Sequence, residues 1–252
     1  MNNKYLDFVL KETTQNNVNK TNDPDILFQF SLNRRNVIEW YPFESRTAVL
    51  EIGAGAGIIT QMLCERGLIV DIIEQNEELL EANLATNKCN SIQLQELIEN
   101  KKKYRYIILV GGVEGCYGNG IDSFDRLIAL LRENLEEDGT LILGVENRYA
   151  VSLLARGYDG KDMNALVSKN ELEQILHRYF HSVELYYPSP DLYFANTIYS
   201  DNYLPKVDEN FGHSIELFQD KAVSFNESVE LMMASKDGLF PLFANSYLAV
   251  CS

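Results

Sequence analysis

The sequence predicts an α/β fold: a doubly wound, mostly parallel seven-stranded sheet with an antiparallel last strand, N-terminal helices and an inserted lid region. Short apolar runs alternate with amphipathic helices from Ala48 onward, and a glycine-rich turn follows the first run. Such apolar runs are typical of parallel strands covered on both faces. We expect an N-terminal helical segment over 1–45, a core over 46–187, an inserted lid or substrate region over 188–239 and a final core strand over 240–252.

Two helices are expected before the first strand. The first covers Lys4–Lys11. The second covers Pro24–Trp40, because Asp23 is a favourable N-cap and proline suits the first helical position. The sequence "WYPF" then ends this helix.

From Ala48 the hydrophobic period and the capping residues define each element. Asn76 caps one helix, the turn "EEDG" precedes the fifth strand, and Ser168 with Glu171 predicts a capping box. Residues 188–239 lack a clear period, and long stretches of this kind usually serve as lids or binding elements. The expected strands are 48–52, 68–74, 91–95, 105–110, 140–145, 182–187 and 243–252, and the expected helices are 57–66, 77–86, 123–135 and 168–180.

Composition excludes several classes of partner. The net charge of −15 over 252 residues would repel phosphate backbones and anionic lipids, and the basic run Lys101–Lys103 is interpreted as a solvated turn. We expect no secretory leader, because the first 17 residues contain no uninterrupted apolar region, and no membrane span, because no apolar stretch approaches the roughly 20 residues that one needs. The cysteines are scattered, which indicates reduced thiols in a cytoplasm; they are Cys64, Cys89, Cys116 and Cys251.

The glycine turn in "VLEIGAGAGIIT" is the main functional signal. Gly53, Gly55 and Gly57 follow a strand and open a helix, an arrangement that lets a ligand approach the backbone. Their spacing departs from the dinucleotide fingerprint G-x-G-x-x-G, since Ile58 stands at the third glycine. Glu51, two residues before the turn, favours a cationic ligand over a diphosphate. Glu74, which ends the second strand, can accept hydrogen bonds from ribose hydroxyls. This position would suit NAD equally well.

At these residues the sequence resembles the class I (Rossmann-like) methyltransferases that use S-adenosylmethionine. Their first motif is an acid, any residue and G-x-G-x-G at the end of the first strand. The resemblance implies that the glycines admit the methionine portion and the ribose, and that Glu51 helps to place the amino group. The cofactor contacts that we expect are Glu51, Gly53, Ala54, Gly55, Gly57, Glu74, Gln75, Gln95, Glu96 and Gly111. For Gln95 and Glu96, a contact with the adenine amino group and a solvated loop are equally open.

Other segments resemble a bacterial subgroup of these methyltransferases that is often associated with sugar or surface-polysaccharide genes. These segments are "RNVIEWYPF", "ENRYA", "YYPSPDLYFANTIYSDNYLP" and "GLFPLFANSYLAV". The match would extend over about 34–251. It implies a small-molecule acceptor, without fixing which one.

In this fold the reacting centre lies beyond the fourth strand, in "GGVEGCYGNG". Glu114 and Tyr117 are the polar candidates there, and His213 is a further candidate base. Glu114 could instead only order its loop. The Asn/Asp-Pro-Pro-Tyr motif of methyltransferases that act on amino groups of bases is absent from this loop, which argues against a nucleic-acid amine.

No metal is expected. His177 and His181 are spaced as a helical pair but lack a third ligand, so we interpret them as surface residues. Asp191 is either a turn carboxylate or a contact for an acceptor hydroxyl. For nine aromatic residues, a place in the core and a place in a lid over the acceptor are equally open interpretations. They are Tyr179, Phe180, Tyr186, Tyr187, Tyr193, Phe194, Tyr199, Tyr203 and Phe211.

These observations predict a cytoplasmic S-adenosylmethionine-dependent methyltransferase that acts on a small polar acceptor, with oxygen as the favoured acceptor atom. Neither nucleic acid nor membrane is an expected partner, and the sequence allows a homodimer. Two alternatives remain open. One is a catalytically inactive protein of the same fold that binds the cofactor, and the other is an NAD-dependent oxidoreductase, against which Ile58 argues.

Overall fold

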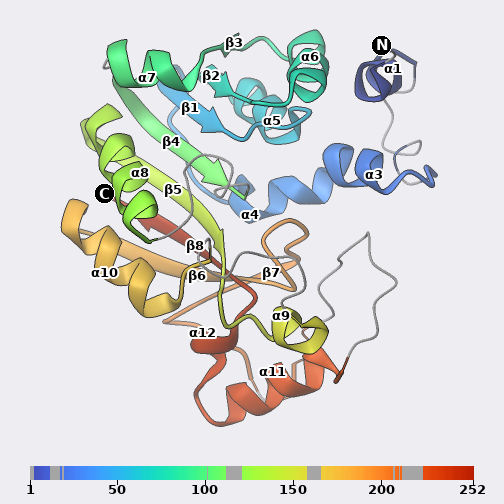
Figure 1. Cartoon of the computed structure of the whole chain (residues 1–252), viewed down its shortest axis with the longest axis vertical. Coiled ribbons are helices and arrows are strands. Elements are labelled where there is room, and N and C mark those ends of the chain that lie inside the picture. The colour runs from blue at the N-terminus through green and yellow to red at the C-terminus, as the bar shows by residue number, and fades with distance from the viewer. Residues whose placement is uncertain are drawn as a thin grey trace. The chain divides into compact units, whose positions relative to one another are not determined.

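The structure is a computed structural model that describes residues 3–11, 18, 20–100, 102–111, 121–157, 166–206, 208–209, 211 and 224–252. Helices and strands alternate along the chain, as the colour gradient of Figure 1 shows. The chain divides into two compact units. The first contains Met1–Ile108 with Asn134–Gly139, and the second contains Leu109–Glu133 with Thr140–Ser252. The fold class predicted from the sequence, mixed α/β with a mostly parallel sheet and one antiparallel edge, is confirmed. The described residues form an eight-stranded sheet, whereas seven strands were predicted, because the strand Thr197–Ser200 was not expected.

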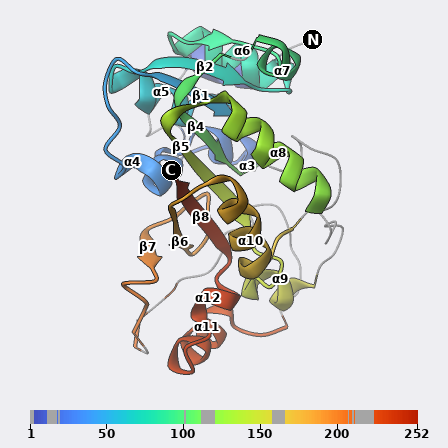
Figure 2. The same cartoon turned by 90° about the vertical axis from the view of Figure 1, so that its left-hand side faces the viewer.

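The first unit contains the parallel part of the sheet, with strands in the order β3-β2-β1-β4-β5. Strand β1 (Ala48–Ile52) pairs in parallel with β2 (Ile69–Ile73), and β2 pairs in parallel with β3 (Asn90–Ser91). Strands β4 (Tyr104–Val110) and β5 (Leu135–Glu146) begin in this unit and continue into the second one. The helices that belong to these strands are α5 (Ile58–Glu65), α6 (Glu77–Thr86) and α7 (Leu94–Asn100), visible in Figures 1 and 2.

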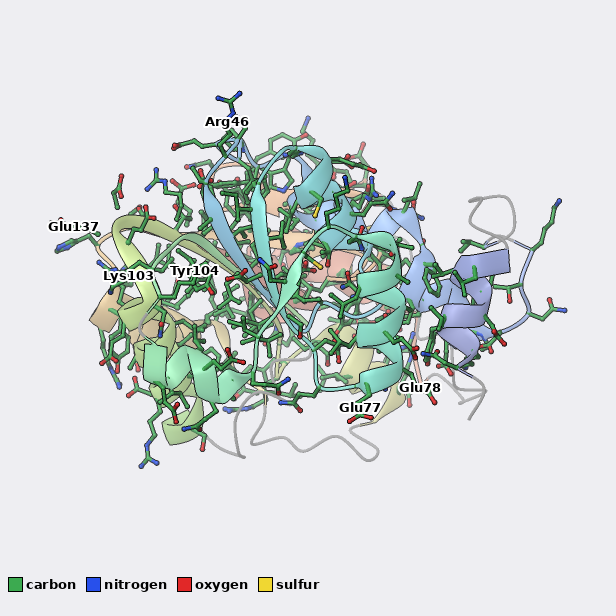
Figure 3. The ribbon with its side chains drawn as sticks, turned by 90° about the horizontal axis from the view of Figure 1, so that it is seen from above. Arg46, Glu77, Glu78, Lys103, Tyr104 and Glu137 are labelled. Atoms are coloured by element: carbon green, nitrogen blue, oxygen red, sulfur yellow. The ribbon has the colours of Figure 1, made fainter. Side chains whose placement is uncertain are left out.

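A buried aspartate ties three of these strands together. Asp71 of β2 is 1% exposed and accepts hydrogen bonds from the Tyr104 hydroxyl at 2.7 Å and from the Asn90 amide at 3.1 Å. Lys102 forms an ion pair with the same carboxylate. Figure 3, viewed from above, shows Tyr104 inside the fold, whereas Glu77 and Glu78 lie at the exposed start of α6. The acidic first turn suits the positive end of the helix dipole.

Asn76 caps α6 as predicted, since its side chain accepts from the backbone N–H groups of Glu78 and Leu79. The third strand differs from the prediction, because it has two residues and is followed by helix α7. Glu96 accepts from the Gln93 N–H at 3.0 Å, while the Glu96 N–H donates to the Gln93 carbonyl at 3.0 Å. These bonds start a helical turn, and burial of Leu97 fixes it against the core. The alternating pattern "SIQLQ" therefore did not specify a strand.

The N-terminal helices are partly as predicted. Helix α1 (Lys4–Lys11) has the predicted bounds, and Asp23 caps the next helix. The expected helix over 24–40 is instead three pieces: α3 (Pro24–Phe30), the 3-10 helix η1 (Leu32–Arg35) and α4 (Asn36–Glu39). The break is at Ser31, whose backbone is extended, with φ −67° and ψ 125°. It redirects the chain so that Phe30, Val37 and Ile38 are all buried, and this burial overrides the propensity for one continuous helix.

The second unit contains the antiparallel edge, with strands in the order β4-β5-β8-β6-β7. Strand β8 (Ser246–Cys251) is antiparallel to both β5 and β6 (Val183–Ser189), which confirms the predicted antiparallel last strand. Strand β7 (Thr197–Ser200) was not predicted and pairs with β6 through Tyr187 and Tyr199. At four residues it is too short for its period to stand out. The predicted turn "EEDG" lies within β5, whose first residues carry exposed acids.

The remaining helices of the second unit are α8 (Ile121–Asn134), α9 (Val151–Arg156), α10 (Lys169–Tyr179), α11 (Glu227–Lys236) and α12 (Phe240–Phe243). The capping box of Ser168 and Glu171 at α10 is confirmed. Among the described residues, none of the helices combines the length and the apolarity that crossing a bilayer requires.

Aromatic residues form part of the core of the second unit. The Phe240 ring contacts the rings of Tyr187, Tyr199 and Phe211, with centroid separations of 5.4 to 5.9 Å. Phe180 is also buried, whereas Tyr203 is 59% exposed. The nine aromatics are therefore divided, and at least four of them are core residues.

Candidate cofactor-binding site

The glycine turn has the backbone conformation that its sequence predicted. Gly53, Gly55 and Gly57 have φ values of 72°, 55° and 94°, a region that side chains other than glycine rarely adopt. The turn begins where the Gly53 N–H donates to the Ile73 carbonyl at 2.8 Å, and Gly57 caps helix α5. Gly53 is exposed, whereas Ala54 and Gly57 are buried. The turn thus presents its first glycine to solvent and packs its last one against the protein.

Neighbouring side chains fill the space that a Cβ atom would need at two of the glycines. At Gly55, an added Cβ would lie 2.6 Å from Gln29 Oε1 and 3.6 Å from Arg34 Nη1. At Gly57, it would overlap Asn87 and lie 2.5 Å from Asn83 Oδ1. The glycines are therefore required by close approach as well as by φ.

Behind the turn lies a buried polar network. The Thr60 hydroxyl donates to Glu51 Oε2 at 2.6 Å, and Asn83 Nδ2 donates to Thr60 Oγ1 at 3.0 Å. The amides of Asn83 and Asn87 also donate to the carbonyls of Gly55 and Gly57, at 3.3 and 3.1 Å. The network joins β1, α5 and α6 and holds the backbone of the turn in place.

Glu51 is a buried acid, 3% exposed. Its pKa is raised to about 8, chiefly by burial; the Thr60 hydrogen bond and the Arg34 charge act in the opposite direction, and the Glu74 charge acts in the same direction as burial. A cation close to Glu51 would favour the ionised form. The residue therefore suits a positively charged ligand, as the sequence indicated.

Glu74 lies at the end of β2 and contacts the turn directly. Its Oε2 accepts from the Gly55 N–H at 2.7 Å, and its Oε1 accepts from the Asn76 N–H at 2.8 Å. An ionised carboxylate has about four acceptor positions, so each oxygen can accept a further donor. The structure brings together Glu51, Ala54, Glu74 and the three glycines in the first unit, and Gln75 follows Glu74 at the exposed end of β2.

Gln95 and Glu96 lie on helix α7 and not at the end of a strand. Gln95 donates to Glu99 at 2.6 Å, and Glu96 accepts from the Gln93 N–H. Both side chains are engaged within the helix, and their contact with adenine stays a prediction.

The second unit contains Gly111, at the end of β4. Gly111 has φ 78°, and its N–H donates to the Gly144 carbonyl at 3.2 Å. The Tyr193 ring lies against it so closely that an added Cβ would be 2.8 Å from the phenolic oxygen. The segment "PSPDLY" therefore places an aromatic hydroxyl at the end of the fourth strand.

Asp191 and Asn245 hold this segment. Asp191 is 8% exposed and accepts from the N–H groups of Tyr193 and Phe194, both at 2.9 Å, so it is a turn carboxylate. Asn245 donates to the Pro190 carbonyl at 2.8 Å and accepts from the Ser152 N–H at 2.9 Å. The candidates Glu114, Tyr117 and His213 lie outside the described residues.

Within the described ranges, no group of three or more His, Cys, Asp or Glu side chains could hold a metal ion. His177 and His181 are both exposed. The site residues that sequence reasoning did not identify are Gln29, Arg34, Thr60, Asn83 and Asn87. The four-residue spacing of Asn83, in α6, and Asn87, its C-cap residue, was the available signal for two of them.

Comparisons with known proteins identify the fold. No family model matches the sequence, and neither does any curated protein. An S-adenosylmethionine-dependent methyltransferase from Archaeoglobus fulgidus is 16% identical with a TM-score of 0.56, covering 91% of this chain and 94% of that one. Magnesium protoporphyrin IX methyltransferase from Synechocystis, with bound S-adenosylhomocysteine, is 13% identical with a TM-score of 0.54, covering 75% and 94%.

A third structure is phosphoethanolamine N-methyltransferase 2 of Haemonchus contortus in complex with S-adenosylmethionine. It is 13% identical with a TM-score of 0.56, and the match covers 98% of this chain and 59% of that one. At these identities the likeness concerns the fold and not the acceptor. The chain has the fold of S-adenosylmethionine-dependent methyltransferases.

Proposed function

We propose that the chain binds S-adenosylmethionine at the glycine turn and transfers its methyl group to a small polar acceptor. The observation that carries this proposal is that Glu51 and Glu74 both lie next to the turn and interact electrostatically with each other. Glu51 is buried two residues before Gly53, and Glu74 accepts from the Gly55 N–H. Two carboxylates beside an open backbone favour a ligand with positive charge and free hydroxyls.

The residues present fit the proposed cofactor. The remaining acceptor positions of Glu74 suit the two ribose hydroxyls, which is the role of an acid at the end of a second strand. Glu51 would balance the positive charge of the sulfonium and amino groups. Gly53, which is exposed, leaves room for the ligand to pass the backbone.

The same contacts argue against NAD. A diphosphate is bound by N–H groups at the start of the helix, with a glycine where helix and strand pack closest. Here the Gly55 and Ala56 N–H groups donate to side chains of Glu74 and Gln29, and Ile58 is buried in an apolar cluster. The nearby acids would also repel phosphate.

When bound, S-adenosylmethionine supplies a methyl group that its sulfonium has already activated. The protein's task is to hold the acceptor in line, and orientation of this kind contributes up to roughly 7–11 kcal/mol in intramolecular models. Glu114 or His213 would accept the proton of a hydroxyl acceptor, with Tyr117 as a further contact.

We propose a sugar hydroxyl or another small metabolite as acceptor. The net charge of −15 supports this choice over nucleic acid and over an anionic membrane surface. The sequence motifs that resemble a sugar-associated subgroup support it as well. We also propose a cytoplasmic location, which the scattered cysteines support, and a homodimer is compatible with the proposal.

Titration calorimetry with S-adenosylmethionine, S-adenosylhomocysteine and NAD side by side tests the cofactor. We expect binding of the first two, and exclusive binding of NAD would overturn the proposal. Formation of S-adenosylhomocysteine in the presence of candidate sugar acceptors then separates an enzyme from a protein that only binds the cofactor. Turnover with at least one acceptor is the expected result.

A further inference from the structure

A cavity of about 260 Å³ lies between helices α9, α11 and α12 of the second unit, and we call it the α11 cavity. Figures 1 and 2 show α11 beside α12, and α11 also contacts α9. Most of its wall is apolar, with Leu154 and Met233 among the lining residues. The wall contains no residue of the glycine turn and neither of the acids that we propose for the cofactor.

Polar contacts within the protein hold these helices together. Arg156, the last residue of α9, forms an ion pair at 2.9 Å with Glu227 of α11, which is buried. The Asn147 amide donates to the carbonyl of Leu242 in α12 at 2.8 Å and to that of Ala244 at 2.7 Å. The walls of the cavity are therefore positioned by the chain itself, as in most small-molecule sites.

Two acids give the α11 cavity an unbalanced negative charge. Glu230 and Asp237 both line it, both are exposed, and neither forms an ion pair with a described residue. They share one face of α11 with Met233, because the three residues are spaced three and four apart. Asp237 is also the C-cap residue, at the negative end of the helix dipole. These charges favour a cation at this edge of the cavity.

Two phenylalanine rings add to this preference. Phe225 and Phe243 line the cavity together with the two acids. An aromatic ring attracts an ammonium group to its face, and apolar surface beside it can bury the rest of an organic cation. Phe225 is exposed, so part of its surface is available to a ligand.

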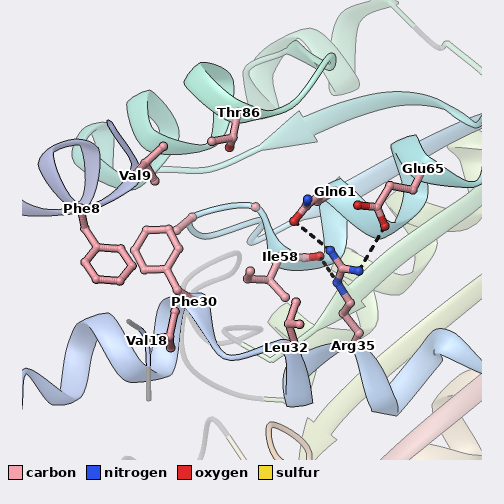
Figure 4. Close-up of a pocket in the computed structure, with 12 residues that line it drawn as sticks. Phe8, Val9, Val18, Phe30, Leu32, Arg35, Ile58, Gln61, Glu65 and Thr86 are labelled. Carbon is pink, nitrogen blue, oxygen red and sulfur yellow. Dashed lines mark hydrogen bonds and ion pairs between the residues drawn. The ribbon is translucent and has the colours of Figure 1, made fainter. Parts of the chain in front are cut away.

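The cavity beside α5 has a different electrostatic character, as Figure 4 shows. That cavity has a volume of about 320 Å³, and its basic residue is Arg35. Arg35 forms an ion pair with Glu65 at 3.2 Å and donates to the Gln61 side chain at 2.8 Å and to the Ile58 carbonyl at 3.1 Å. The charges of its wall are balanced, whereas the two acids of the α11 cavity have no cation among the described residues.

We propose that the α11 cavity binds a small organic cation, an ammonium group that carries an apolar body. The ammonium lies beside Glu230 and Asp237, and the apolar body packs among Leu154, Met233 and the phenylalanine rings. This site is additional to the proposed cofactor site and does not depend on methyl transfer.

The test uses three hexyl compounds that differ in the charge of the head group: hexylammonium, 1-hexanol and hexanoate. Methionine labelled with ¹³C at its methyl group gives the readout in the full chain, because Met233 lines the cavity and Met62 is buried in the first unit. Met233→Leu assigns the resonance. We expect hexylammonium to shift the Met233 signal saturably and to leave Met62 unchanged.

Hexylammonium should bind roughly 3- to 30-fold more tightly than 1-hexanol, the range for exposed ion pairs together with a cation–π contact. Hexanoate should bind more weakly than 1-hexanol, because the acids repel it. The double variant Glu230→Gln/Asp237→Asn should bind hexylammonium and 1-hexanol equally, with 1-hexanol unchanged from the wild type. Glu77→Gln/Glu78→Gln, which neutralises two exposed acids of α6, is the matched control and should keep the preference.

A second pair of variants tests the cavity without changing its charge. Leu154 and Leu32 are exposed to a similar extent, 37% and 40%, and each lines one of the two cavities. Leu154→Trp fills part of the α11 cavity, so it should weaken hexylammonium and 1-hexanol alike. Leu32→Trp should leave both affinities at the wild-type values.

Three results would overturn the inference: no saturable shift of Met233 with hexylammonium, binding of hexanoate as tight as that of hexylammonium, or a preference that persists in Glu230→Gln/Asp237→Asn. If that double variant does not fold, as judged by circular dichroism, unchanged binding by Leu154→Trp would overturn it as well. None of these results bears on the proposed function, which calorimetry with S-adenosylmethionine tests separately.

Discussion

The Thr60 hydroxyl donates to the buried carboxylate of Glu51 at 2.6 Å, and this bond connects the first strand to the helix that the glycine turn opens. Thr60 has no exposed surface, so water cannot replace the bond. We expect Thr60→Val to lower the free energy of unfolding by about 1–3 kcal/mol, because both Glu51 and Asn83 lose a buried partner. Urea unfolding measures the change. Thr60→Ser, which keeps the hydroxyl, should cost much less, and equal effects of the two variants would contradict this role.

Stability should depend on pH through Glu51. Burial raises the pKa of Glu51 to about 8, so the folded protein keeps a proton that the unfolded chain releases at its ordinary pKa. The contribution of protonated Glu51 to the free energy of unfolding is therefore complete below the ordinary pKa of glutamate. It is lost as the pH rises through about 8. We expect the wild type to lose stability over this range relative to Glu51→Gln, with a slope of up to about 1.4 kcal/mol per pH unit. Parallel pH profiles of the two proteins would show that Glu51 titrates normally.

Gly57 should tolerate substitution less well than another glycine of similar backbone conformation. Gly57 and Gly238 have φ values of 94° and 72°, but an added Cβ meets Asn83 and Asn87 at the first and nothing within 4 Å at the second. Gly57→Ala should therefore destabilise the protein by the backbone strain of about 1 kcal/mol plus the overlap, and Gly238→Ala by the strain alone. Thermal unfolding compares them. If the two variants lose the same stability, the side chains of Asn83 and Asn87 move aside at little energetic cost, which would contradict this prediction.

Contact between Gly111 and Tyr193 predicts a coupled pair of substitutions. A methyl group at Gly111 would overlap the Tyr193 ring, so Gly111→Ala should destabilise by about 1–3 kcal/mol. Tyr193→Ala removes the ring, and the double variant should recover part of the Gly111→Ala cost. A double-mutant cycle in urea measures the coupling. Additive effects would indicate that the ring does not pack on this glycine.

Elements that depend on local chemistry were predicted well from the sequence. Asn76, Asp23 and Ser168 each cap a helix as expected, because a capping side chain bonds to N–H groups two or three residues away. The glycine turn was also recognised, since its spacing, the strand before it and the helix after it are all visible in the sequence. The antiparallel last strand followed from the recognised fold.

Elements that depend on tertiary contacts were not predicted. The break at Ser31 reflects burial on both sides of it, and helix α7 forms where an alternating pattern indicated a strand. Thr60 and Asn83 have polar partners that lie far away in the sequence, so no local pattern marks them as part of the site. Arg34 and Arg35 are adjacent and chemically identical, and only the structure shows that the first faces the turn.

A crystal structure with S-adenosylhomocysteine tests the central claim most directly, because the claim concerns where the ligand lies. The account predicts the ribose hydroxyls within hydrogen-bond distance of Glu74 and the methionine portion beside Gly53 and Gly55. A ligand that binds away from this turn, or crystals in which the Glu74 carboxylate contacts no part of the nucleoside, would contradict it.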